Sequence, residues 1–153
     1  MKKCVTIARA LKEKNRVAGR LAKALNLVSR ENSQDSNVPR GVDVDATYAQ
    51  AKELRKRLVE TKTAIALANQ PIVGKIIELE EIKSEISYLN GLDVKEGVFV
   101  SNSYNSTVTN EYSAVIKKQQ VLEEVERLQS RADRLQDELD EFNALTKVEI
   151  EVD

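Results

Sequence analysis

Histidine is absent from this sequence, and Cys4 is its only cysteine. Without histidine, neither a Ser-His-Asp nor a Cys-His site can form, and the commonest metal ligand and neutral-pH switch are missing. Cys4 has only Lys2 and Lys3 nearby to activate its thiol, in an N-terminus that we expect to be frayed. A single cysteine also excludes an intramolecular disulfide and a Cys-rich zinc or iron-sulfur site within one chain. We therefore expect no catalytic residue and a chain that is not an enzyme.

A group of carboxylates is the remaining candidate for metal chemistry. Helical spacing puts Glu78, Glu81 and Glu85 on one side of a single segment, with Glu80 close by. Carboxylate metal sites in helical bundles normally combine glutamate with histidine, so a solvated helix face is the favoured interpretation and a carboxylate-metal enzyme is the third hypothesis. No glycine-rich phosphate loop or dinucleotide fingerprint is present. We expect neither a cofactor nor a bound metal.

A stripe of cations runs along the N-terminal segment. The first thirty residues hold nine Lys or Arg and one acid, Glu13. At roughly 100° per residue, five cations fall within about 80° of arc, opposite an apolar stripe of Ile7, Leu11, Ala18 and Leu25. We call these five the basic stripe: Arg9, Lys12, Arg16, Arg20 and Lys23. Such a stripe suits nucleic-acid phosphates or an anionic membrane surface, but acids between residues 123 and 141 provide a partner in the same chain or another copy, which we favour.

Composition indicates a folded chain of amphipathic helices. Hydrophobic residues make up 41% of the 153 residues and charged residues 32%, which is unlike a disordered chain, and this length suits a single helical domain over residues 1–153. No apolar run is long enough for a signal peptide or a membrane span, so we expect a cytoplasmic protein without a transmembrane segment. We therefore take the glycosylation triplet at residues 105–107 to be a coincidence.

Apolar spacing predicts four helices and the breaks between them. The first covers residues 6–32 and is followed by a polar loop over residues 33–44. The second begins near Asp45 as its N-cap and carries Ala51, Leu54, Leu58, Ile65 and Ala68 on one face. It ends before Pro71, where a corner starts the third helix. The third helix covers residues 71–90 and ends at Gly91; its apolar face holds Ile72, Ile76, Leu79, Ile82, Ile86 and Leu89, with Val73 and Ile77 broadening it.

The last helix has the clearest periodicity in the chain. We expect it over residues 110–145, roughly 54 Å long, after a long loop or β-hairpin at 92–109 with strands near 97–108. Its apolar seam recurs at the spacing that a coiled coil needs: Val121, Val125, Leu128, Ala132, Leu135, Leu139 and Phe142. The alternating residues 147–152 predict a short half-buried strand, which pairs with Val98–Val100 or with another copy.

Two segments of the chain carry a resemblance to known proteins. The first is Ile7 to Arg16, with the sequence IARALKEKNR, and the second is Leu135 to Ala144, with the sequence LQDELDEFNA. They resemble small helical proteins of bacteria and their phages, including the septicolysin-like family, and the resemblance around them covers about a third of the chain. The resemblance implies a helical, self-associating protein and a component of a phage virion; it transfers no functional residue.

The sequence therefore predicts a mainly α fold, an antiparallel helical bundle or coiled coil with about four helices and short strands. The first functional hypothesis is a non-enzymatic structural or scaffolding protein that forms a homo-oligomer, with the seam of the last helix completed by the first helix and by other copies. It would reside in the cytoplasm or, if phage-encoded, in a virion. The alternative is a nucleic-acid-associated protein that uses the basic stripe.

Overall fold

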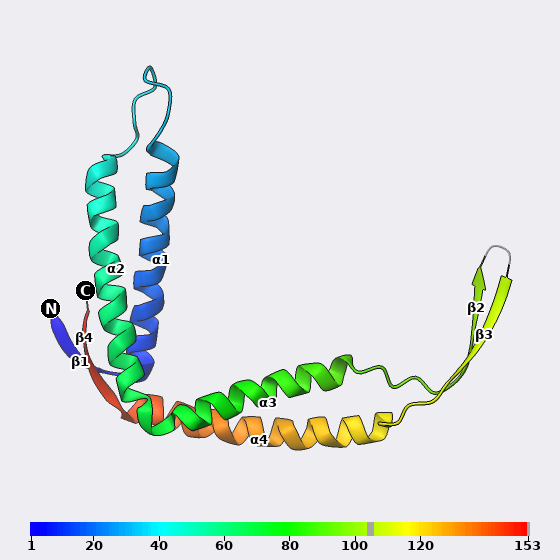
Figure 1. The fold of residues 1–153 in the computed structure, drawn as a ribbon. Coiled ribbons are helices and arrows are strands. Elements are labelled where there is room, and N and C mark those ends of the chain that lie inside the picture. The colour runs from blue at the N-terminus through cyan, green and yellow to red at the C-terminus, as the bar shows by residue number, and fades with distance from the viewer. Residues whose placement is uncertain (104–105, 153) are drawn as a thin grey trace. The chain divides into compact units, whose positions relative to one another are not determined.

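The arrangement of the helices comes from a computed structural model that describes residues 1–103 and 106–152 (Figure 1). Within these residues the fold is mainly α with four α-helices and short strands, as predicted; it also has one short 3₁₀ turn, and its strands form two antiparallel two-stranded sheets. The chain forms two compact units. Unit 1 comprises Met1–Val73 and Asp140–Asp153, and unit 2 comprises Gly74–Leu139. The single domain over residues 1–153 stays a prediction. The two units are defined by contacts within each of them, and this does not show whether either unit folds alone.

An antiparallel pair of helices forms most of unit 1. Helix α1, Ile7–Glu31, and helix α2, Val44–Ala68, lie side by side and are joined by a loop over residues 32–43 (Figure 1). The Thr6 side chain caps α1 by accepting a hydrogen bond from the Arg9 amide. The predicted cap of α2, Asp45, is wrong: Asp43 accepts the Ala46 amide at 2.9 Å, and Asp45 lies in the first turn. Both residues are aspartates, but a cap must stand directly before the first helical residue, where its side chain reaches a backbone amide that has no partner within the helix. Since α2 begins at Val44, that residue is Asp43.

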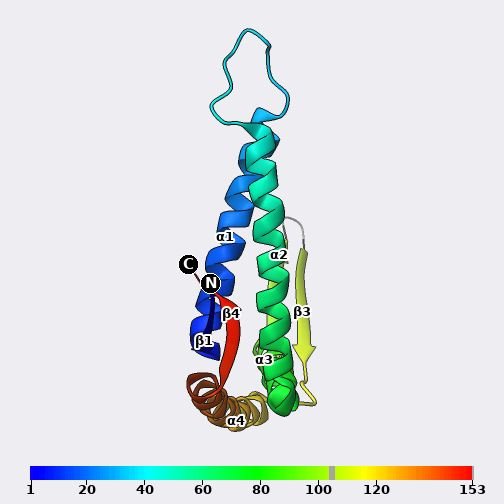
Figure 2. The same cartoon turned by 90° about the vertical axis from the view of Figure 1, so that its left-hand side faces the viewer.

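A two-stranded sheet closes unit 1. Strand β1, Lys2–Thr6, pairs antiparallel with strand β4, Lys147–Glu151, so that Val5 faces Val148. The sheet lies beside the N-terminal half of α1 (Figure 2). The frayed N-terminus and the pairing of β4 with Val98–Val100 were wrong predictions, because β1 has a single buried side chain and so shows no alternation in the sequence. The half-buried strand itself is confirmed: Val148 and Ile150 are buried, and the residues between them are exposed.

The core of unit 1 lies between this sheet and the two helices. Its buried residues come from all four elements and the C-terminal tail: Val5, Ile7, Ala10, Ile65, Val148, Ile150 and Val152. On α1, the buried face contains Ile7, Ala10, Glu13, Val17 and Ala24. It is turned by roughly 90° from the predicted apolar stripe, so Leu25 is 42% exposed and the basic stripe borders the buried face instead of opposing it. Alanines on the buried face of α1 let α1 and α2 approach closely. Because these side chains are small, the spacing of large apolar residues does not predict this face.

Two further helices form the body of unit 2. The 3₁₀ turn Gln70–Ile72 lies at the break predicted before Pro71, and helix α3, Val73–Gly91, follows it in the chain. Leu79 and Ile82 are buried and Ile76, Ile86 and Leu89 are half-buried, which confirms the predicted face. The additional apolar positions Val73 and Ile77 are more than half exposed.

Helix α4, Lys118–Leu145, runs antiparallel to α3 (Figure 1). The predicted start at residue 110 is wrong, because residues 110–112 belong to a strand and residues 113–117 are not helical. The helix therefore has 28 residues and is about 42 Å long. Its seam faces inward: Val121, Leu128, Ala132, Leu135 and Leu139 are buried, and Val125 and Phe142 are half-buried.

Residues of the same chain cover this seam. In unit 2, α3 lies beside α4, and Phe142 packs against the core of unit 1. The seam of α4 was predicted to be covered by the first helix and by other copies. For the seam residues up to Leu139 this is not needed, because the apolar face of α3 covers them. Among the described helices, none has the length and apolar character needed to cross a membrane.

Candidate association surface

The hairpin of unit 2 carries apolar side chains on both faces. Strand β2, Gly97–Ser103, pairs antiparallel with strand β3, Ser106–Tyr112. Paired residues point to the same face, so Phe99, Val108 and Tyr112 share one face, and Val98 and Val100 share the other. These five residues, which we call the hairpin patch, are each between 42% and 62% exposed. The hairpin was predicted near residues 97–108 and is confirmed; Tyr112 had been assigned to the last helix.

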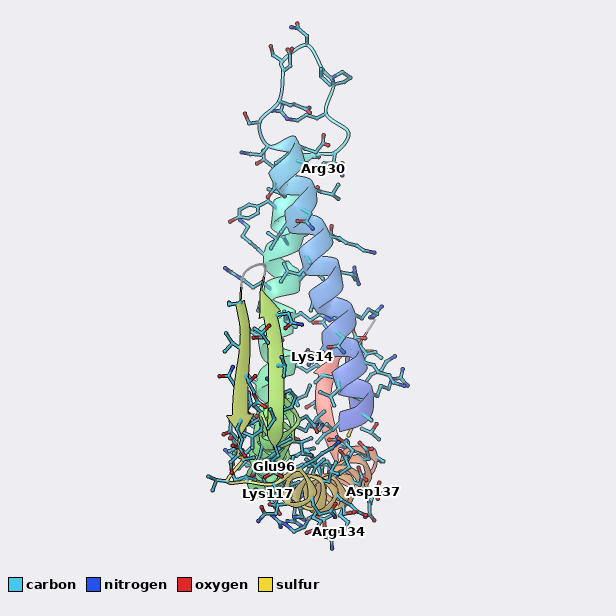
Figure 3. All side chains as sticks on the ribbon, turned by 90° about the vertical axis from the view of Figure 1, so that its right-hand side faces the viewer. Lys14, Arg30, Glu96, Lys117, Arg134 and Asp137 are labelled. Atoms are coloured by element: carbon cyan, nitrogen blue, oxygen red, sulfur yellow. The ribbon has the colours of Figure 1, made fainter. Side chains whose placement is uncertain are left out.

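Polar contacts fix the base of the hairpin. Glu96 and Lys117 form an ion pair where the two strands leave the helices (Figure 3). The Asp93 carboxylate accepts the Lys95 amide at 3.1 Å, and this hydrogen bond together with the Lys95 ammonium lowers the pKa of Asp93. Gly97 has a φ of +97°, a conformation that strains any residue with a Cβ. The base of the hairpin is therefore held in a defined conformation.

Contacts between aromatic rings fix side chains of the hairpin patch in place but do not bury them. Phe99 and Tyr112 meet edge to face, with ring centroids 5.5 Å apart and planes at 83°. The Lys95 ammonium lies 5.7 Å from the centre of the Tyr112 ring. Every described side chain of β2 and β3 remains exposed. The aromatic pair thus stabilises the hairpin locally and leaves most of its apolar area in water.

The outer edges of the hairpin also lack protection. Sheet pairing joins β2 only to β3 in the described residues, so each strand has a second edge with amide and carbonyl groups directed outward. Native sheets usually protect such edges with lysine, proline or bulges. Within these strands the only charged side chain is Glu111. The hairpin can therefore accept a further strand as well as an apolar surface.

Two ion pairs join helices α3 and α4 in unit 2. Glu78 accepts two hydrogen bonds from the Arg131 guanidinium, at 2.7 and 2.9 Å, and Lys75 binds Glu138 at 2.5 Å. The Arg131 hydrogen bonds lower the pKa of Glu78, and the Lys75 hydrogen bond lowers that of Glu138. Among the described residues, no group of three or more His, Cys, Asp or Glu is placed to hold a metal ion. Glu80, Glu81 and Glu85 are exposed.

The basic stripe lies on the exposed side of α1, and all five of its side chains are exposed. Arg16 also donates two hydrogen bonds to Glu13, at 3.0 and 2.7 Å. Glu13 is buried and forms a second ion pair with Arg57 of α2, whose guanidinium also donates to the Glu151 carbonyl at 3.3 Å. In the sequence Glu13 stands out only as the single acid among cations. Its position three residues before Arg16 is the feature that could have predicted an ion pair within the helix.

A shallow hollow in unit 1 is one of the concave features that could bind a ligand. It has a volume of about 330 Å³ and is lined by Val59, Ala64, Leu67 and Ile150, with Lys2 and Glu149 at its margin. Cys4, the only thiol, is exposed and faces Glu149 across the β1–β4 pair. This lining combines apolar side chains with solvated charges in a shallow surface, so the hairpin patch is the stronger candidate surface.

Comparison with known proteins gives no relative. No protein-family model matches the chain, and neither a curated protein nor a solved structure is significantly similar to it.

Proposed function

We propose that this chain is a non-enzymatic structural protein that associates with copies of itself through the hairpin patch. The observation that carries the proposal is the exposure of apolar side chains on both faces of β2–β3. An isolated two-stranded hairpin is at best marginally stable in water, so a partner surface would stabilise it. Open strand edges of the same sequence in every copy suit one another, as strand addition between identical hairpins requires.

The energy available at this surface supports specific association. Fully burying a Val or Phe side chain contributes about 1.5–3 kcal/mol, and residues that are about half exposed retain roughly half of that. Several such residues in one patch, together with new strand hydrogen bonds, can offset the cost of joining two molecules. The helical seam, which sequence analysis assigned to association, contributes less because its residues are already buried within the chain.

A role in a large assembly is the structural setting that we favour for this self-association. The resemblance of the opening and closing segments to small phage and bacterial proteins supports a virion component if the chain is phage-encoded, and a cytoplasmic assembly otherwise. The absence of histidine and the polar contacts that occupy Glu78 and Glu138 support the non-enzymatic part of the proposal.

Analytical ultracentrifugation of the full chain over a range of concentrations tests the proposal. Wild-type protein should form species larger than a monomer as concentration rises. The double variant Val98→Ser/Val100→Ser removes one apolar face, and Phe99→Ser weakens the other; both should shift the distribution toward monomer. Circular dichroism should show unchanged helix content, because the hairpin side chains are exposed.

A matched control separates the hairpin from apolar exposure in general. Val59 on α2 is 58% exposed, close to the 62% of Val98 and the 59% of Val100. The variant Val59→Ser should therefore leave the sedimentation unchanged. A wild-type chain that stays monomeric at every concentration, or hairpin variants that assemble like the wild type, would contradict the proposal.

A further inference from the structure

The two units have net charges of opposite sign. Unit 1 contains 16 Lys and Arg against 12 Asp and Glu, whereas unit 2 contains 8 against 13. The excess charge is concentrated on two helices. On α1 it forms the basic stripe, and on α4 it forms an acidic stripe of four exposed carboxylates: Glu123, Glu126, Asp133 and Asp137.

The acidic stripe lies on the solvent side of α4. At roughly 100° per residue its members fall within about 80° of arc, nearly opposite the buried seam that includes Leu128 and Leu135. Glu123 and Asp133 each accept a hydrogen bond at 2.8 Å from a neutral glutamine, Gln119 and Gln129, one turn earlier. These contacts hold the carboxylates outward without neutralising their charge. Two cations border the stripe: Arg127, which is paired with Glu124, and Arg134, which donates to the Ser130 carbonyl at 3.2 Å.

The basic stripe matches this surface in length and width. Residues 9 to 23 and residues 123 to 137 span the same number of positions, which is about 21 Å of helix. Both stripes occupy about 80° of arc. Among the basic residues, Arg9, Lys12 and Lys23 make no side-chain ion pair or hydrogen bond within the described part of the chain. Arg30 and Lys14 lie on the same helix outside the stripe (Figure 3).

We propose that the basic stripe of one copy docks along the acidic stripe of a second copy. This inference rests on the proposed self-association, because it takes another copy as the occupant. The contact joins unit 1 of one molecule to unit 2 of the next, so it is heterologous: an open array keeps one unused basic stripe at one end and one unused acidic stripe at the other. Such contacts produce a closed ring or an extending filament, whereas pairing of like hairpins produces a dimer.

Three charge-reversal variants test the contact. The α1 variant carries Arg9→Glu, Lys12→Glu and Lys23→Glu, and it spares the cations with partners in their own chain. The α4 variant carries Glu126→Lys, Asp133→Lys and Asp137→Lys. A control on α2 reverses the same number of exposed cations through Lys52→Glu, Lys56→Glu and Lys62→Glu. Assembly size is measured by ultracentrifugation at low and high salt, with circular dichroism as the check on folding.

The proposal predicts a charge-swap pattern. The α1 and α4 variants should each lose the salt-sensitive larger species, with the dissociation constant raised about tenfold or more, while the control retains them. Mixing the two variants should restore assembly, because the reversed α1 of one then faces the reversed α4 of the other. A single chain that carries both sets of changes should also assemble again. Restoration of this kind cannot come from misfolded variants.

Other outcomes would overturn the inference in distinct ways. Unchanged assembly in the α1 and α4 variants would show that the stripes do not join copies. Salt-sensitive binding of a duplex oligonucleotide that the α1 variant alone abolishes, with no restoration on mixing, would assign the stripe to nucleic acid instead. Failure of the hairpin proposal looks different: Val98→Ser/Val100→Ser would then leave all species intact, including those that persist at high salt.

Discussion

Removing the Glu13 carboxylate should destabilise unit 1 far more than removing its exposed neighbour Arg16. Glu13 and Arg57 form an ion pair in which the side chains are 8% and 11% exposed. The variant Glu13→Ala leaves the Arg57 cation nearly buried without this carboxylate, while the Glu151 carbonyl still accepts a hydrogen bond from it at 3.3 Å. Breaking a buried pair from one side costs about 3–5 kcal/mol, and the retained carbonyl places this variant near the lower end.

The variant Arg16→Ala provides the contrast. The Arg16 side chain is 45% exposed and is paired with the same carboxylate at 2.7 Å. Its loss leaves Glu13 with Arg57, so the free energy of unfolding should fall by less than about 1 kcal/mol. Replacing both members of the buried pair, with Glu13→Leu and Arg57→Met, should recover most of the loss, because an apolar pair of similar volume leaves no charge buried.

Urea unfolding followed by hydrogen exchange distinguishes these outcomes, since exchange reports on α1 and α2 separately from α3. Glu13→Ala should lower the stability of α1 and α2 amides, with those of α3 as an internal reference. If Glu13→Ala is as mild as Arg16→Ala, or if the double replacement is worse than the single one, the reasoning about a buried charge is incorrect.

Three further predictions concern the helices. Leu135→Ala, at a side chain with no exposed area, should cost unit 2 about 2–5 kcal/mol in chemical unfolding, whereas the same change at Leu122, which is 54% exposed, should cost little. Asp43→Ala should lower the free energy of unfolding of unit 1 by about 0.5–2 kcal/mol through loss of the α2 cap, and Asp43→Asn should restore most of it. Glu78 and Glu138 have pKa values lowered from 4.5 in the folded chain, so their contribution to the free energy of unfolding is present above pH 4.5 and is lost as pH falls through the lowered values. Unfolding of α3 and α4 should therefore become easier over this acid range. A Glu78→Gln/Glu138→Gln variant should lose that part of the pH dependence.

The helical part of the fold could be predicted from the sequence because large apolar residues recur at helical spacing. The α3 face and the α4 seam follow this rule directly, since leucine and isoleucine occupy their buried positions. The buried face of α1 does not follow it, because Ala10, Ala24 and Glu13 are buried there while Leu25 is exposed. Close approach of α1 and α2 requires small residues, and a buried acid needs a partner that lies 44 residues away in the sequence.

The strands and the candidate surface were harder to predict for related reasons. Strand β1 has one buried side chain, Val5, so no alternation marks it, and its partner lies at the other end of the chain. The hairpin was visible as an irregular polar segment after residues 98–100, but its register decides which residues share a face, and register follows from pairing that spacing alone does not specify. The length of α4 was overestimated because the end of β3 and the connection at residues 113–117 were assigned to the first turns of the helix.

Hydrogen exchange of the hairpin amides as a function of protein concentration tests self-association through β2–β3 most directly. The amides of residues 98–102 and 107–111 that point away from the partner strand have no sheet partner within the chain. They should exchange rapidly in dilute solution and become protected as the chain assembles, while amides of α3 and α4 change little. Exchange of the hairpin amides that stays equally fast at every concentration, in a sample shown to be oligomeric, would contradict the assignment of this surface.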